Sequence, residues 1–204
     1  MYLSLTMSRF YLIRHGTVDG INDRIYGRAA GIHLTAKGRA QAEAVGRQLG
    51  EADLEAIYSS PLERARETAE AICQRTKVTV AIEPDLNEID FGRWTNCRFD
   101  DLRADPEWQR FNLFRSSAGA PGGELMLAAQ ARVVGAIERL RRQHERVAIV
   151  SHGDVIRALV AHYLGFNLDF IHRLRIDPGS ITVLEVDERG AQFTLINGRP
   201  ATCD

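Results

Sequence analysis

Residues 10–16 read Phe-Tyr-Leu-Ile-Arg-His-Gly, and this segment carries the most information about the fold. Four apolar residues in succession are typical of a short strand that is buried on both faces. The apolar run ends at Arg14, His15 and Gly16, which bring a charge, an imidazole and a flexible backbone to the end of the strand. We therefore expect polar chemistry at the carboxyl end of a buried strand.

A second strand with a similar end is predicted further along the chain. Residues 56–59 predict this strand, which leads into Ser60 and Pro61. Ser60 and Glu63 have the spacing of a capping box, with Pro61 at the first helical position, so we expect a helix to begin there. Arg64 then lies in its first turn.

A third strand is predicted at residues 146–150, and it leads into Ser151, His152 and Gly153 before a helix at residues 155–164. In open α/β sheets, ligands bind outside the carboxyl ends of the strands. We therefore expect one cluster of hydrogen-bond donors at this edge of the sheet, made of Arg14, His15, Arg64 and His152. Such a cluster suits a phosphate dianion, whereas a lone arginine or histidine would more often be a surface or structural residue.

The rest of the chain alternates helices with strands, which predicts a three-layer α/β/α fold with a mainly parallel central sheet and helices on both faces. The further elements that we expect are helices at 35–49 and 124–142, a strand at 77–82, and a hairpin of 180–186 with 191–196. The sequence contains no repeat or linker, so we expect one catalytic domain over residues 1–204, with residues 1–7 as a disordered extension.

The composition is that of an ordinary soluble protein, with 26 Lys and Arg against 27 Asp and Glu and a net charge of -1. This balance argues against nucleic acid or a membrane as partner. The three cysteines form neither a CxxC pair nor a disulfide framework, and a cytoplasmic location is expected. The histidines show no zinc-ligand spacing, so no metal and no cofactor are expected. A homodimer is a candidate assembly.

Several motifs in this order resemble the histidine phosphatase superfamily, the phosphoglycerate mutase-like group. The resemblance runs from about residue 8 to residue 186, and its motifs are residues 12–16, 34–42, 59–69, 122–124 and 151–153. The family implies that His15 attacks phosphorus and becomes a phosphohistidine. It also implies that Arg14, Arg64 and His152 hold the phosphoryl oxygens.

The resemblance points to Glu88 as the general acid and base, within Leu-Asn-Glu-Ile-Asp-Phe-Gly-Arg-Trp at residues 86–94, with Asp90 as the nearby alternative. Like charge beside a phosphate dianion should favour the protonated form of such a carboxyl group. The further substrate contacts that we expect are Asn22, Tyr26, Gly27 and Gly153. The sequence departs from the family at Asn22, whose spacing is one residue longer, and at Thr17, where the family often has Glu.

The leading hypothesis is a metal-independent phosphomonoesterase that acts on a small phosphorylated metabolite. The alternatives are a cofactor-dependent phosphoglycerate-type mutase, a phospholigand-binding protein without turnover, and a protein phosphatase. The short segment 83–123 favours hydrolysis over the mutase, because a mutase must retain its bisphosphate intermediate. Four aromatic residues of this segment are expected either to form an apolar wall over the pocket or to pack in the core: Trp94, Trp108, Phe111 and Phe114.

Overall fold

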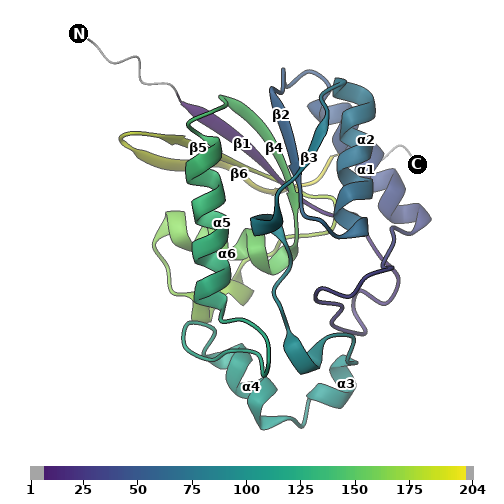
Figure 1. Ribbon diagram of the computed structural model, residues 1–204, viewed down its shortest axis with the longest axis vertical. Helices are drawn as coiled ribbons and strands as arrows, with labels where there is room; N and C mark the ends of the chain where they lie inside the picture. The colour runs from purple at the N-terminus through teal and green to yellow at the C-terminus, as the bar shows by residue number, and fades with distance from the viewer. Residues whose placement is uncertain (1–6, 201–204) are drawn as a thin grey trace.

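The computed structural model describes residues 7–200, and a six-stranded sheet runs through its centre (Figure 1). The strand order across the sheet is β3-β2-β4-β1-β5-β6. The strands are β1 (Ser8–Arg14), β2 (Ala56–Ser59), β3 (Val80–Ile82), β4 (Arg146–Ser151), β5 (Ile181–Asp187) and β6 (Gly190–Gly198). Residues 1–6 of the expected extension lie outside the described residues, and Met7 is exposed.

Four of these strands are parallel, as the sequence predicts. β1 and β2 both pair in parallel with β4, and β2 pairs in parallel with β3, whereas β5 and β6 form the expected antiparallel hairpin beside β1. Arg14 lies opposite Ser151, and Ser59 lies opposite Val150. The carboxyl ends of β1, β2 and β4 therefore lie level with one another at one edge of the sheet.

Helices cover both faces of the sheet, because alternate strand residues point to opposite sides. α1 (Ala36–Leu49) and α2 (Glu63–Thr76) pack on the face that contains Ile13 and Val150. α5 (Met126–Leu140) and α6 (Gly153–Leu164) pack on the face that contains Leu12 and Ile149. These two cores confirm the expected three-layer architecture. No helix in residues 7–200 is long and apolar enough to cross a membrane.

The segment between β3 and α5 extends beyond the edge of the sheet, at the bottom of Figure 1. It contains two short 3-10 turns, η1 (Pro84–Leu86) and η2 (Gly92–Trp94), and two short helices, α3 (Phe99–Leu102) and α4 (Pro106–Leu113). We call residues 83–125 the lid. A further 3-10 turn, η3 (Leu168–Arg173), follows α6.

The expected capping box at Ser60 is wrong. α2 begins at Glu63, and its N-cap residue Leu62 makes no side-chain cap hydrogen bond. The Ser60 hydroxyl instead lies 2.7 Å from Nε2 of His152, a residue of another strand end. The Ser60 side chain therefore makes a long-range contact with His152 in place of the helix cap that the local motif predicts. The strand expected at 77–82 is also shorter, since Lys77 adopts a left-handed conformation after α2.

Candidate active site

His15 follows the last residue of β1 and is almost fully buried, with 4% of its surface exposed. Its backbone N–H donates to the Ser151 carbonyl at 3.0 Å, and Nδ1 lies 2.8 Å from the Gly16 carbonyl oxygen. A carbonyl oxygen only accepts hydrogen bonds, so Nδ1 carries the proton. Burial and the charges of Arg64 and Arg14 hold the pKa of His15 well below its usual range. Nε2 is therefore left with a free lone pair on a neutral imidazole.

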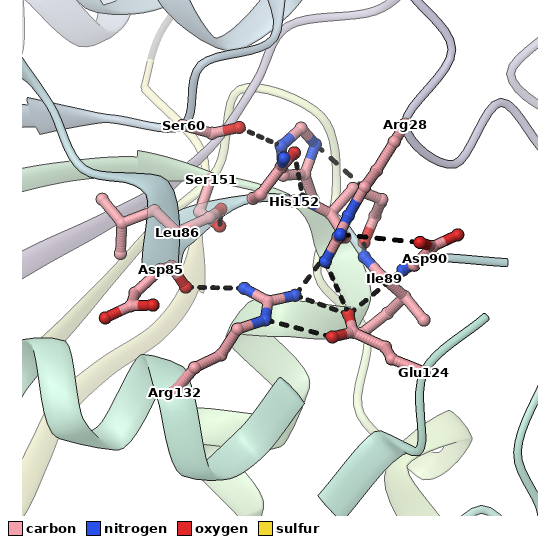
Figure 2. Close-up of polar contacts among 12 residues, drawn as sticks. Arg28, Ser60, Asp85, Leu86, Ile89, Asp90, Glu124, Arg132, Ser151 and His152 are labelled. Atoms are coloured by element: carbon pink, nitrogen blue, oxygen red, sulfur yellow. Dashed lines mark hydrogen bonds and ion pairs between the residues drawn. The ribbon is translucent and has the colours of Figure 1, made fainter. Parts of the chain in front are cut away.

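His152 lies beside His15, with the two ring centroids 5.2 Å apart. Its Nε2 is 2.7 Å from Ser60 Oγ (Figure 2). Ser60 Oγ also accepts a 3.4 Å hydrogen bond from the N–H of Leu62, and within residues 7–200 Nε2 is the one acceptor in hydrogen-bond range of its hydroxyl proton, so Ser60 donates to Nε2. Nδ1 of His152 then carries the ring proton. Burial, followed by the charge of Arg64, holds the pKa of His152 well below its usual range.

Two arginines complete the donor cluster that the sequence predicts. Arg14 donates from Nη1 to the Ile176 carbonyl at 2.7 Å. Arg64, in the first turn of α2, is 2% exposed and donates from Nη2 to the Gly27 carbonyl at 2.8 Å. These two carbonyl contacts fix the direction of both guanidinium groups without neutralising their charge.

Three buried donors of this cluster have no hydrogen-bond partner within residues 7–200: Arg14 Nε, Arg64 Nη1 and His152 Nδ1. A buried donor without a partner costs about 1–3 kcal/mol, so native proteins rarely keep several together. All three belong to neighbours of His15: the charges of Arg64 and Arg14 act on its pKa, and the ring of His152 lies 5.2 Å from its own. The arrangement suits a tetrahedral oxyanion that accepts several hydrogen bonds beside the imidazole.

Glu88 brings a carboxyl group to the same place. Its Oε2 lies 3.8 Å from His152 Nδ1, and its Oε1 accepts a hydrogen bond from the N–H of Ile89 at 2.9 Å. Burial, reinforced by the negative charge of Asp154, raises the pKa of Glu88 to about 7. A carboxyl group with this pKa is suited to donating and accepting a proton near neutral pH.

Asp90, the alternative acid, has a different environment. Its carboxylate accepts a hydrogen bond from the N–H of Gly92 at 2.9 Å and lies 3.6 Å from Nη1 of Arg28. The side chain is 40% exposed and is absent from the lining of the cavity that contains His15 and Glu88. The geometry therefore favours Glu88 over Asp90.

The cavity in front of His15 has a volume of about 290 Å³. Tyr26, Gly27 and Gly153 line it, as the sequence predicts. Asn22 does not; it lines a neighbouring cavity with Lys37 and Arg175, and Arg14 lies between the two. The structure thus brings together all the expected site residues except Asn22. Within residues 7–200, no three His, Cys, Asp or Glu side chains form a group that could hold a metal ion.

The same cavity is also lined by charged residues that the sequence analysis missed. Asp154 pairs with Arg115 at 2.9 Å and with Arg157 at 2.8 Å, and His172 Nε2 lies 3.0 Å from Arg115 Nη2. Burial opposes ionisation of Asp154, but the two arginines hold its pKa far below the usual range. The position of Asp154 directly after Gly153 was the one available signal. Nothing local indicates that Arg115 of the lid would reach it.

Of the two arrangements expected for the four aromatic residues of this segment, the structure favours core packing over a wall along the pocket. Trp94 and Phe111 are fully buried and pack against Trp108 inside the lid, at centroid distances of 5.2 and 5.9 Å, while Phe114 is exposed. Of the four residues only Trp108 lines the cavity, together with Phe91 and Phe99. Trp94, Trp108 and Phe111 therefore form a small core that holds the lid together.

Comparisons with known proteins agree with this geometry. The model of the histidine phosphatase superfamily (branch 1) matches residues 10–199. The adenosylcobalamin/alpha-ribazole phosphatase of Escherichia coli (strain K12) is 29% identical over 202 residues, covering 94% of this chain and 96% of that protein. Phosphoserine phosphatase 1 of Hydrogenobacter thermophilus is 28% identical, covering 94% of this chain and 92% of that protein.

A solved structure also shows similarity to a phosphatase. The mycobacterial glucosyl-3-phosphoglycerate phosphatase superposes with a TM-score of 0.82 at 26% identity, covering 94% of this chain and 99% of that one. The family match spans nearly the whole chain and includes every strand end that forms the donor cluster. The protein therefore belongs to the histidine phosphatase superfamily (branch 1) and is a phosphatase.

Proposed function

We propose that the protein is a metal-independent phosphomonoesterase that works through a phosphohistidine on His15, with Glu88 as general acid and base. The observation that carries this proposal is the set of three unpartnered buried donors: Arg14 Nε, Arg64 Nη1 and His152 Nδ1. Three donors match the three non-bridging oxygens of a phosphoryl group. Charge stabilisation and positioning are what phosphoryl transfer chiefly needs.

In the first half-reaction, Nε2 of His15 attacks phosphorus, and the bond between phosphorus and the ester oxygen breaks. The leaving alkoxide takes the proton of the neutral Glu88 carboxyl group. The ring then carries a positive charge, which the hydrogen bond from Nδ1 to the Gly16 carbonyl stabilises. The raised pKa of Glu88 supports this role, because the acid form is available near neutral pH.

In the second half-reaction, the Glu88 carboxylate takes a proton from a water molecule, and the water oxygen attacks phosphorus. The bond between phosphorus and Nε2 breaks, which releases inorganic phosphate and restores the neutral imidazole. Glu88 ends protonated, ready for the next substrate. The same carboxyl group thus serves first as acid and then as base.

We infer that the substrate is a small phosphate ester of an aliphatic alcohol. A cavity of about 290 Å³ supports a small metabolite. Phosphoserine, after which the relative phosphoserine phosphatase 1 is named, is an ester of this kind. Alkoxides are poor leaving groups, so an acid positioned as Glu88 is suited to them.

The test is phosphate release from a panel of phosphate monoesters in the presence of EDTA, by the wild type and by His15→Ala. We expect turnover by the wild type and none by the variant, with an acid-labile phosphoenzyme trapped only in the wild type. His162→Ala is the matched control, because His162 is an exposed histidine on α6. It should behave as the wild type.

Each other outcome has a definite meaning. Equal activity of His15→Ala would refute the covalent mechanism. Isomerisation that depends on a bisphosphoglycerate primer, without net hydrolysis, would identify a mutase. Loss of activity in EDTA would show that a metal takes part. Thermal unfolding of both variants shows whether the fold is retained.

A further inference from the structure

Glu88 lies on a segment without regular secondary structure. Glu88 follows η1 and precedes η2. We call residues 85–90, which begin in the last two residues of η1, the acid strap. A strand end is held by the hydrogen bonds of the sheet, but the acid strap has no such ladder. Its peptide groups are held instead by side chains from other elements: Ser151 Oγ donates to the Leu86 carbonyl at 2.7 Å, and Arg132 Nη1 donates to the Asp85 carbonyl at 2.6 Å.

The peptide of Glu88 itself is held by two arginines. Arg28 Nε donates to the Glu88 carbonyl oxygen at 2.9 Å, and Arg132 Nη2 donates to the same oxygen at 3.2 Å. Arg28 comes from the loop that follows β1, next to Gly27, and Arg132 comes from α5. Two separate parts of the fold therefore converge on one carbonyl oxygen.

Glu124 joins these two arginines, as Figure 2 shows. Its Oε1 accepts hydrogen bonds from Arg28 Nη2 at 3.1 Å and from Arg132 Nη2 at 2.7 Å. The same oxygen accepts a hydrogen bond from the N–H of Asp90 at 3.1 Å, and the N–H of Glu124 donates to the Asp90 carbonyl at 2.9 Å. One carboxylate thus holds both guanidinium groups and the far end of the acid strap.

Burial makes the loss of any of these contacts costly in free energy. The side chains of Glu124 and Arg132 are only 17% and 16% exposed, so loss of one charge leaves the other poorly solvated. The contact between backbones is also close: a Cβ on Gly123 would lie 2.1 Å from the Asp90 carbonyl oxygen. The acid strap therefore has little freedom to move while Glu124 is in place.

The carboxyl group of Glu88 depends on its own backbone for direction. Oε1 is held by the N–H of the next residue, Ile89, and Oε2 is 3.8 Å from His152 Nδ1, beyond hydrogen-bond range. No long-range hydrogen bond within residues 7–200 fixes this side chain directly. A shift of the Glu88 peptide would therefore shift the carboxyl group with it.

We propose that Glu124, acting through Arg28 and Arg132, is a positioning residue that aims the Glu88 carboxyl group at the leaving oxygen. This inference rests on the proposed function, in which Glu88 protonates that oxygen. A displacement of about 1 Å in a reacting group costs about a hundredfold in rate. The cost falls on substrates that need the acid, and spares those that do not.

The test compares kcat/KM for glycerol 2-phosphate, an alkyl ester, with kcat/KM for p-nitrophenyl phosphate, whose leaving group needs little protonation. We expect Glu124→Gln and Arg132→Met to lose about a hundredfold on the alkyl ester but no more than about threefold on the aryl ester. Arg132→Met keeps the test valid if Glu124→Gln fails to fold. A merely structural role would lower both values equally.

Arg139→Met is the matched control. Arg139 also lies on α5, and it pairs with the carboxylates of Glu83 and Asp85 at the start of the lid. It has no hydrogen bond to the Glu88 peptide. It should leave the ratio of the two substrates unchanged. An equal loss on both esters in Glu124→Gln and Arg132→Met, or no loss on either, overturns the inference.

Glu88→Gln separates this failure from a failure of the proposed function. If Glu88→Gln discriminates between the esters and the Glu124 and Arg132 variants do not, only the positioning role is wrong. If Glu88→Gln does not discriminate, or the wild type hydrolyses neither ester, the proposed function fails and the inference fails with it.

Discussion

The two halves of the active site are built in different ways. The half at the sheet edge contains Arg14, His15, Arg64 and His152, and each of these residues ends a strand or begins a helix. The half on the lid contains Glu88, which is held by side chains and by close contacts of glycine with backbone. In the proposed mechanism, the first half binds the phosphoryl group, which all phosphate esters share. The second half contacts the leaving alcohol, in which they differ.

This difference has a physical basis. Backbone hydrogen bonds of a sheet position a strand end whatever the surface residues are, because the ladder does not depend on side-chain identity. The acid strap depends on particular ion pairs and on particular glycines. A lid of this kind can change between relatives without disturbing the site that binds the phosphoryl group.

The largest expected effect compares two arginines that are equally buried, one in each half. Arg64 and Arg115 are each 2% exposed, and both line the cavity. Arg64→Met should lower kcat/KM by about a thousandfold on alkyl and aryl phosphates alike, because it removes a charge from the phosphoryl oxygens. Arg115→Met should act mainly through KM, by about tenfold. Similar losses of kcat in both variants would break the distinction between the halves.

An intermediate effect is expected from two glycines that touch backbone. A Cβ on Gly16 would lie 2.4 Å from the Gly38 carbonyl oxygen. A Cβ on Gly92, where φ is +51°, would lie 2.1 Å from the Pro121 carbonyl oxygen. Gly16→Ala should lower kcat/KM on both kinds of ester by about a hundredfold, since it displaces His15. Gly92→Ala should lower it by about thirtyfold on alkyl esters alone.

Steady-state kinetics with the two esters, together with urea unfolding of each variant, check this pair. If Gly92→Ala slows the aryl ester as much as the alkyl ester, the lid takes part in binding the phosphoryl group, and the separation of the halves is wrong.

The smallest expected effect is in the pH dependence. Since burial raises the pKa of Glu88 to about 7, its acid form is lost as the pH rises through that value. We expect kcat/KM for an alkyl ester to fall about fivefold between pH 7 and about pH 8. The imidazoles of His15 and His152 stay neutral over this range, because burial lowers the pKa of both. Aryl esters, and the Glu88→Gln variant, should lack this alkaline limb.

Local patterns in the sequence are enough to predict the three-layer fold and the cluster of donors at the sheet edge. Apolar runs such as residues 10–13 specify buried strands, and parallel strands bring their carboxyl ends together at one edge. The positions of Arg14, His15, Arg64 and His152 follow from these local patterns. This prediction needs no knowledge of long-range side-chain contacts.

The surroundings of that cluster depend on long-range packing. Ser60 has the sequence pattern of a helix start, yet its hydroxyl contacts His152, which is 92 positions away in the sequence. Arg28 reaches the Glu88 carbonyl across 60 positions, and Arg115 reaches Asp154 across 39. Asn22 is expected to contact the substrate although its spacing is one residue longer than in the family, and it lines the neighbouring cavity instead. Such contacts depend on how loops and the lid pack against the sheet, and local propensity contains no information about that packing.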